Sequence, residues 1–435
     1  MNRTRSLPVI MPKVSGQQWS CHSCGDCCRT LVGHLFDDEQ ERIKQQGWLE
    51  KLGVAPMVRL GRQWVLNKRA DGTCVFLSED NRCRIHAEYG EDAKPLACRI
   101  FPFSVRPVRN GWQASLRFDC PSVVQSKGQP LRQHRAWLAK LVERLDHQSP
   151  AEHDTADLQK RRPATVEEID VVVSRFTRWL RSDVGSLSDR LIAAARITAA
   201  LSGARLASVR GPQFTELVDL LFASPLEDFA VSSPPATRRQ RGMLRQLVFA
   251  HAEFVTLEER KSSFVRKLLK RWDQLRGGRR FRRGRGIVGK PDGLPGGITF
   301  DDVESVEPPA ADHEQIDNLA LRYLIARIEG RSVFGDGYYG WQVFAGLTAL
   351  WLSVAAAGWL ARQSAAIDGR RALTFADVGS ALGIVDRAAT RVPALGSIAE
   401  RARVVYLLRE DGIARLLDAF SFLPESSLAN PVEPT

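Results

Sequence analysis

Residues 21–28 read CHSCGDCC, and this short run holds half of the cysteines in the chain. The other four also lie in the first 120 of the 435 residues, and the rest of the chain has none. Two-residue spacing lets consecutive thiolates face one metal centre, as in zinc knuckles and ferredoxins. The sequence therefore predicts a metal site with eight candidate ligands: Cys21, Cys24, Cys27, Cys28, Cys74, Cys83, Cys98 and Cys120.

The spacing within the run allows one centre or two. Cys21, Cys24 and Cys27 form a C-x2-C-x2-C series, and Gly25 supplies the backbone freedom that a tight ligand loop needs. Cys27 and Cys28 are adjacent, and neighbouring side chains in extended backbone point to opposite faces. We therefore expect either that these two cysteines serve different centres or that one of them is not a ligand. Eight thiols could form two sites of four cysteines each.

The residues beside the cysteines favour metal binding and leave the metal open between zinc and an iron–sulfur cluster. Cys120-Pro121 resembles the Cys-Pro that closes bacterial ferredoxin motifs, which favours a four-iron cluster. His22 and His86 are additional nitrogen donors, although a lone histidine more often has a structural role. Four arginines lie within one residue of a cysteine and are expected to lower thiol pKa values: Arg29, Arg82, Arg84 and Arg99.

The net charge of +12 is concentrated in one segment. Between Arg266 and Lys290 there are eleven Lys or Arg residues and one Asp, which together supply +10. This segment could contact nucleic acid, with Trp272 and Phe281 stacking on bases. It could equally meet an acidic protein or a membrane surface, or form a solvated linker.

The N-terminal residues lack the long apolar stretch of a secretory signal, so we expect a cytoplasmic protein. Thiols stay reduced in the cytoplasm, which favours metal ligands over a disulfide framework. The glycine pattern at 284–289 follows arginines where a nucleotide-binding motif needs an apolar strand, so no nucleotide fingerprint is indicated. No Ser/His/Asp or paired-carboxylate pattern is evident either, and catalytic residues remain unassigned.

Hydrophobic spacing predicts an α+β fold that is mainly α. Short strands are expected from Met57 to Leu66 and from Cys74 to Leu77, and helices from about Leu131 onward, including one basic helix from Met243 to Leu275. The expected organisation is a flexible leader (1–18), a cysteine domain (19–125), a helical region (131–275), a basic Gly/Pro-rich linker (276–312), a second helical region (313–423) and a disordered tail (424–435).

Two local features give sharper expectations. Asn110-Gly111 is a strong hairpin-turn signal. A turn there would place residues whose numbers add up to 221 opposite each other across the hairpin, and it would bring Cys98 and Cys120 together.

Residues 341–361 carry no charge over 21 positions, which is long enough to span a bilayer. The small residues of this segment favour a buried bundle helix over a membrane span.

The segments CHSCGDCC (21–28), CVFL (74–77), CRIH (83–86), PLACRIFPF (95–103) and RFDCP (117–121) together resemble the cysteine-cluster family named for its CxxCxxCC motif. Members are described as zinc- or iron-chelating proteins and include the flagellin lysine N-methylases. The resemblance covers about 19–122, and the run from Asn318 to Leu352 is similar to the helical C-terminal part of those methylases. It implies that the cysteines bind a metal centre and that the protein transfers methyl groups from S-adenosylmethionine to lysines of a protein such as flagellin. The alternative is a non-enzymatic zinc- or iron-binding module whose basic segment contacts nucleic acid or an acidic partner.

Overall fold

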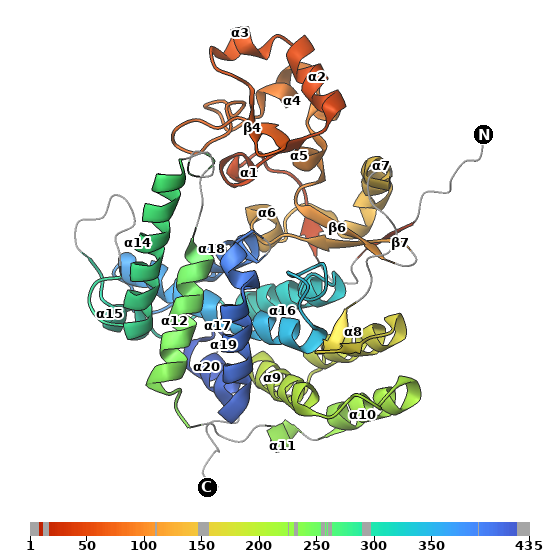
Figure 1. Cartoon of the computed structure of the whole chain (residues 1–435), viewed down its shortest axis with the longest axis vertical. Helices are drawn as coiled ribbons and strands as arrows, with labels where there is room; N and C mark the ends of the chain where they lie inside the picture. The colour runs from red at the N-terminus through yellow and green to blue at the C-terminus, as the bar shows by residue number, and fades with distance from the viewer. Residues whose placement is uncertain are drawn as a thin grey trace.

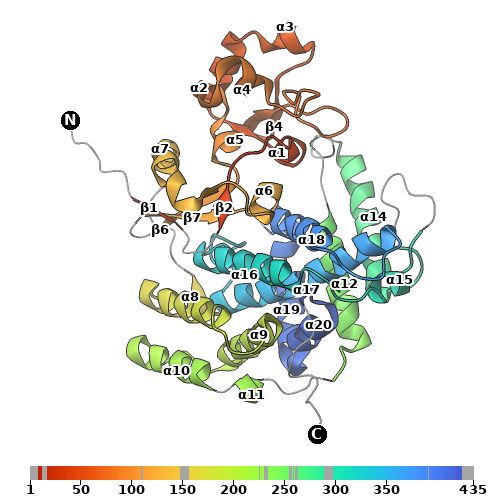
Figure 2. The same ribbon diagram turned by 180° about the vertical axis from the view of Figure 1, so that it is seen from behind.

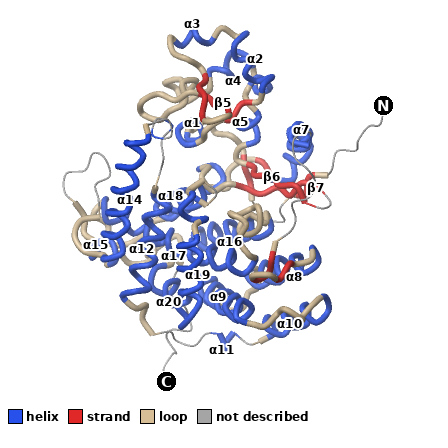
Figure 3. Tube along the Cα trace, in the orientation of Figure 1, coloured by secondary structure: helices blue, strands red, loops and turns tan. Residues whose placement is uncertain are grey.

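The computed structural model describes residues 8–11, 17–108, 111–146, 156–224, 226–229, 234–253, 257, 259, 263–288, 297–389 and 391–423. A small upper part, called here the cysteine lobe (residues 20–102), stands on a larger helical body formed by most of the remaining residues (Figure 1). Helices dominate the body, and strands are few and short (Figure 3). The expected α+β, mainly α, class is confirmed.

Short elements and loops make up the cysteine lobe. Its three-stranded antiparallel sheet has the order β3-β5-β4, and Gly61 turns the chain between β4 and β5 with a positive φ of 63°. Ten buried side chains, including Trp48 and Phe76, form its separate core. Its elements are α1 (Asp26–Thr30), β3 (His34–Leu35), α2 (Asp37–Gln45), α3 (Trp48–Leu52), β4 (Met57–Leu60), β5 (Gln63–Leu66), α4 (Arg84–Tyr89) and α5 (Leu96–Ile100). The predicted strand from Cys74 to Leu77 is reduced to isolated bridges, Lys68 to Cys74 and Leu77 to Cys83.

The hairpin of β6 (Phe103–Val108) and β7 (Gly111–Leu116) joins the lobe to the body. Phe103 pairs with Leu116 and Val108 pairs with Gly111, so the residue numbers of paired residues add up to 219. The prediction was 221, so the predicted register was wrong by two positions. Gly111 is the first residue of β7 and not a turn residue, and glycine is required there because a Cβ would lie 2.2 Å from the carbonyl oxygen of Pro8. The predicted turn residue Asn110 lies outside the described residues. A two-residue shift leaves each side chain on its expected face, but both faces of β7 are buried, Gln113 and Ser115 included.

Part of the expected leader is structured. Strand β1 (Val9–Ile10) pairs in parallel with β7 at Trp112 and Gln113, and β2 (Gln18–Trp19) pairs with β8 (Gln129–Pro130). Val9 and Trp19 are buried in the core of the body. The start of the chain is therefore fastened to the segment that contains Cys120.

Helix α17 (Val343–Ile367) is the centre of the body, and α9, α12, α18 and α20 pack around it (Figures 1 and 2). It is long and apolar enough to cross a membrane by length and composition, but 89% of its most apolar window is buried inside the protein. Arg362, near its end, donates hydrogen bonds to the carbonyls of Val306, Gly358, Phe420 and Ser421. The structure thus agrees with a buried bundle helix.

The remaining elements surround α17 and share its core, so the two expected helical regions are one body. They are α6 (Pro121–Val124), α7 (Arg135–Asp146), β9 (Asp157–Gln159), β10 (Arg162–Pro163), α8 (Val166–Leu180), α9 (Leu187–Gly203), α10 (Gly211–Ala223), α11 (Leu226–Phe229), α12 (Arg238–Ala252), α14 (Phe264–Arg283), α15 (Phe300–Glu304), α16 (His313–Glu329), α18 (Phe375–Ala388), α19 (Ile398–Leu408) and α20 (Gly412–Phe420).

In the described residues, the predicted basic helix from Met243 to Leu275 is interrupted between α12 and α14. Helix α12 ends at Ala252, where Glu253 adopts an extended conformation, and α14 starts afresh after Ser263, whose side chain accepts from the N–H of Arg266. Helix α14 also continues to Arg283, into the segment expected to be linker. Gly284, with a positive φ of 59°, ends this helix.

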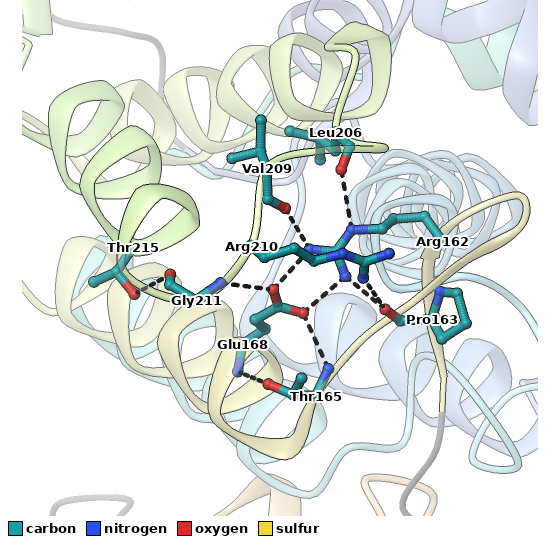
Figure 4. A network of polar contacts seen from close by, with 9 residues as sticks. All are labelled: Arg162, Pro163, Thr165, Glu168, Leu206, Val209, Arg210, Gly211 and Thr215. Atoms are coloured by element: carbon teal, nitrogen blue, oxygen red, sulfur yellow. Dashed lines mark hydrogen bonds and ion pairs between the residues drawn. The ribbon is translucent and has the colours of Figure 1, made fainter.

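A buried ion pair holds the β9–β10 hairpin, helix α8 and the start of α10 together (Figure 4). Arg162 donates to both carboxylate oxygens of Glu168 at 2.8 and 2.6 Å. Glu168 also accepts from the backbone N–H groups of Thr165 and Gly211. Burial alone would raise the pKa of Glu168, but these four donors outweigh it and lower the pKa to about 2.

We predict that Glu168→Gln destabilises the protein by about 3–5 kcal/mol, because it leaves the buried Arg162 guanidinium without its counter-charge. The carboxylate's contribution is complete above its ordinary pKa of 4.5 and is lost as pH falls toward about 2. The difference between wild type and variant should therefore shrink over that pH range. Urea unfolding at several pH values measures it, with Glu143→Gln on the exposed face of α7 as control; a pH-independent difference would contradict the assignment.

Candidate metal centre

The CHSCGDCC run forms a loop and one short helix. Gly25 precedes helix α1 with φ 76°, and a Cβ there would lie 2.7 Å from the Arg29 guanidinium. The need for glycine at this position is thus both conformational and steric, as the spacing had suggested. Cys27 and Cys28 lie inside α1 and not in extended backbone, so their side chains diverge by about 100° and not by 180°. The expectation of opposite faces was wrong for this reason.

Backbone hydrogen bonds carry the later cysteines to the same place. The N–H of Cys74 donates to the carbonyl of Cys28 at 2.9 Å, and a tight turn then returns the chain so that Cys83 bridges Leu77. Cys98 lies in α5, and Cys120 directly precedes α6. Four separate segments of the chain therefore converge.

All eight cysteines line one cavity of about 580 Å³. His22 and His86 line it as well, and the Nδ1 atom of His22 lies 2.9 Å from the hydroxyl of Ser122. The ionic side chains along its wall are mainly cations, with one carboxylate: Lys68, Arg82, Lys94, Arg99 and Glu91. A wall of soft thiols and cations suits a thiolate-bound metal that carries net negative charge, and does not suit a hard cation that prefers oxygen ligands.

The thiols line the cavity, but they do not converge closely enough to bind one metal ion together. Within the described ranges, no three His, Cys, Asp or Glu side chains are already placed to hold one metal ion. A tetrahedral zinc site with Zn–S bonds of about 2.3 Å would hold its sulfurs only about 3.8 Å apart. The wider arrangement leaves room for a larger inorganic group.

Packing divides the cysteines between the two cores. Cys74 is part of the core of the cysteine lobe, and Cys28, Cys83 and Cys98 pack against it. Cys120 belongs instead to the core of the helical body. Cys98 and Cys120, which were predicted to come together, line the same cavity. They pack against different cores, Cys98 against that of the lobe and Cys120 in that of the body.

Electrostatic interactions give a matching division. Cys98 interacts with Cys74, Cys83 and Cys27, whereas Cys120 interacts with Cys24. Cys24 in turn interacts with both Cys21 and Cys27. Cys27 interacts most with Cys28, and it also interacts with Cys74 and Cys98, so it links Cys24 to the first group.

Burial raises the pKa of the inner thiols. Desolvation raises the pKa of Cys74 and of Cys120 to about 11, and it raises that of Cys98 well above its ordinary value. A hydrogen bond with Cys28, followed by burial, raises the pKa of Cys27. Without metal these thiols hold their protons, so metal binding must release them.

Three of the arginines beside the cysteines have partners other than the thiols. Arg29 contacts Asp26 and Asn81, Arg82 pairs with Asp80, and Arg99 pairs with Asp92. Two lysines lower thiol pKa values: Lys68 lowers that of Cys74, and Lys94 lowers those of Cys27 and Cys98, although burial outweighs them.

These two lysines were missed from the sequence because they are distant from the cysteines they face. The only local signal was their position before a ligand segment: Lys68 lies six residues before Cys74, and Lys94 four residues before Cys98. Sequence adjacency favoured the arginines, but acidic neighbours occupy three of them.

A second cavity of about 680 Å³ lies between the lobe and the body. Leu31 and Lys68 line both cavities, so the two share a wall. The body contributes cations and two titratable side chains to the second cavity: Arg117, Arg387, Arg391, His251 and Glu253. Burial lowers the pKa of His251 to about 4 and raises that of Glu253, so the imidazole is neutral.

Comparison with known proteins supports the metal assignment. Residues 20–121 match the CxxCxxCC family model, described as a "putative zinc- or iron-chelating domain". This segment is a CxxCxxCC domain. The match contains every cysteine of the chain and extends past the cysteine lobe to the β6–β7 hairpin and Cys120.

A relative among known proteins is similar to about a fifth of the chain. "Uncharacterized protein MJ0939" of Methanocaldococcus jannaschii is 33% identical over 89 residues, which are 20% of this chain and 30% of that protein. The chain thus matches less than a third of the length of this relative. No solved structure matches the chain.

Lys68 should control how firmly the CxxCxxCC domain holds its metal. Its ammonium donates to the carbonyls of Arg29 and Cys28 at 2.8 and 3.3 Å, two carbonyls at the end of α1 that have no helical partner. We predict that Lys68→Met releases metal to an external chelator about 10–100-fold more readily, because α1 loses this support. Lys51→Met, which removes an exposed pair with Glu88, is the control. Equal release from both variants would contradict this role.

Proposed function

We propose that the CxxCxxCC domain holds two iron–sulfur clusters, each bound by four thiolates. The observation that carries this proposal is that four separate segments bring all eight cysteines to one cavity. The family description leaves zinc and iron open. The wide placement of the thiols and the size of the cavity support clusters over single tetrahedral zinc ions.

The packing suggests which cysteines form each centre. The inner centre would use Cys74 and the three cysteines that pack with it, Cys28, Cys83 and Cys98. The outer centre would use Cys120, Cys24, Cys21 and Cys27. Among these four, Cys24 interacts electrostatically with each of the other three. A four-iron cluster with four thiolates carries about −2, and the cationic wall would balance that charge.

The two-centre proposal predicts the metal content of two variants. Anaerobically purified Cys98→Ser and Cys120→Ser should each retain about half of the wild-type iron and sulfide, because each loses a ligand of one centre only. His86→Asn is the matched control and should retain all of it. Metal analysis and a visible absorption spectrum measure the iron and sulfide content. Complete loss of both in both variants would indicate one shared centre. Stoichiometric zinc in the wild type would contradict the clusters and indicate zinc sites.

We further propose that the protein is a lysine N-methyltransferase that uses S-adenosylmethionine and acts in the cytoplasm on a protein such as flagellin. The support is the resemblance to flagellin N-methylases together with the second cavity, which adjoins the proposed centres through Leu31 and Lys68. The methyl group would move from the sulfonium to the lysine nitrogen, S-adenosylhomocysteine would leave, and the amine would lose a proton.

The side chains of the second cavity fit this division of roles. Arg387 and Arg391 could bind the carboxylate of the cofactor. Glu253 is the carboxylate along the described wall, and burial raises its pKa, so it could accept the proton of the lysine substrate. Iron–sulfur centres supply one-electron chemistry. In this protein their role could instead be structural, to hold in place the loop that carries Leu31 into the wall of the second cavity.

Methyl transfer from labelled S-adenosylmethionine to purified flagellin tests this activity. Wild type should label lysines, and Glu253→Gln should lower the rate about 100-fold or more, as loss of a general base does. Glu314→Gln, exposed at the start of α16, should leave the rate unchanged. Absence of labelling by the fully loaded wild type would remove flagellin as substrate without affecting the metal proposal.

A further inference from the structure

Helix α14 exposes a continuous apolar stripe. Five side chains on its first three turns are between 57% and 64% exposed: Val265, Leu268, Leu269, Trp272 and Leu275. Their spacing of three and four residues places them on one face of the helix. Such a face normally packs against a core, so this one requires an explanation.

Cations surround this stripe. Arg266 and Arg271 are exposed on the other faces of the same turns, and farther along Arg276, Arg279 and Arg280 are exposed as well. In the part of the chain that the structure describes, none of these five arginines forms an ion pair. The helix therefore presents apolar surface bordered by unneutralised positive charge.

The second half of α14 fixes the helix to the body. Phe281 is buried against Phe249, Phe300 and Trp359. Gly277 permits this close approach, because a Cβ there would lie 2.5 Å from the ring of Phe249. The first half extends from that anchor along one flank of the molecule, opposite α8 and α10 (Figures 1 and 2). The exposed stripe thus lies on a helix whose other end is anchored to the body.

We infer that α14 docks the protein on the surface of an anionic lipid membrane, with the stripe in the acyl boundary and the arginines among the headgroups. An interfacial helix needs an apolar face that includes leucine or tryptophan and a basic polar face, and α14 has both. Basic residues gain further from anionic lipid headgroups.

The other partners satisfy only part of this surface. Nucleic acid would pair with the arginines but would leave the leucines and Val265 in water. A second copy of the chain would cover the stripe but would bring together two segments of about +10 each. A groove-binding helix relies on a few deeply inserted anchors, whereas this stripe is evenly exposed along its length.

Flotation with lipid vesicles tests the inference on the full-length protein. Wild type should bind vesicles that contain phosphatidylglycerol and should bind neutral phosphatidylcholine vesicles at least about tenfold more weakly, since charge contributes much of the attraction. The double variant Leu269→Ser/Trp272→Ser keeps every charge and should lose at least about tenfold in binding to the anionic vesicles. Leu49→Ser, which is 61% exposed on α3 in the cysteine lobe, is the matched control and should bind as wild type does.

Two results would overturn the inference. One is equal binding of anionic vesicles by wild type and the double variant. The other is tight binding of a DNA oligonucleotide that Arg266→Gln/Arg271→Gln abolishes and the double variant retains, which would assign the helix to nucleic acid. Thermal unfolding of each variant confirms that the body is intact, and the anchor at Phe281 is unaltered in all of them.

Discussion

Eight sulfur atoms have to be held around one cavity by elements only four to six residues long, or by loops, and this constraint governs the structure. The cysteine lobe has a core of ten buried side chains, among which Cys74 is itself a member. A core of that size provides little stability by itself. Burial also raises the pKa of the inner thiols, so they stay protonated until a metal replaces their protons. Metal binding and the folding of the lobe should therefore be closely coupled.

The helical body supplies the rigidity that the lobe lacks. The segment before Cys120 is fixed by the N–H of Phe118, which donates to the buried carboxylate of Asp386 at 2.9 Å, and by the edge-to-face contact of Phe118 with Tyr323. Asp386 lies in turn 3.3 Å from the guanidinium of Arg327. The CxxCxxCC domain is thus continuous in sequence but belongs to two cores, one of which is built mainly by residues outside the family match.

The sequence was most informative where chemistry depends on residue type, and least where it depends on distant neighbours. Cysteine spacing identified the eight residues that line the cavity, and small residues in α17 favoured a buried helix. The hairpin register was wrong by two positions, and Gly111, expected in the turn, instead starts β7 and lies against the carbonyl of Pro8, about a hundred residues earlier in the chain. The roles of Lys68 and Lys94 were missed for the same reason, since folding and not adjacency decides which cation faces a thiol.

The division of the cysteines between two cores has a mechanical consequence. An outer centre that joined Cys120 of the body to Cys21 and Cys24 would act as an inorganic clasp across the junction, whereas the inner centre would lie within one rigid part. The ion pair of Arg144 in α7 with Asp38 in α2, at 2.6 Å, also joins the lobe to the body, so loss of the outer centre would weaken the junction beside the second cavity without freeing the lobe.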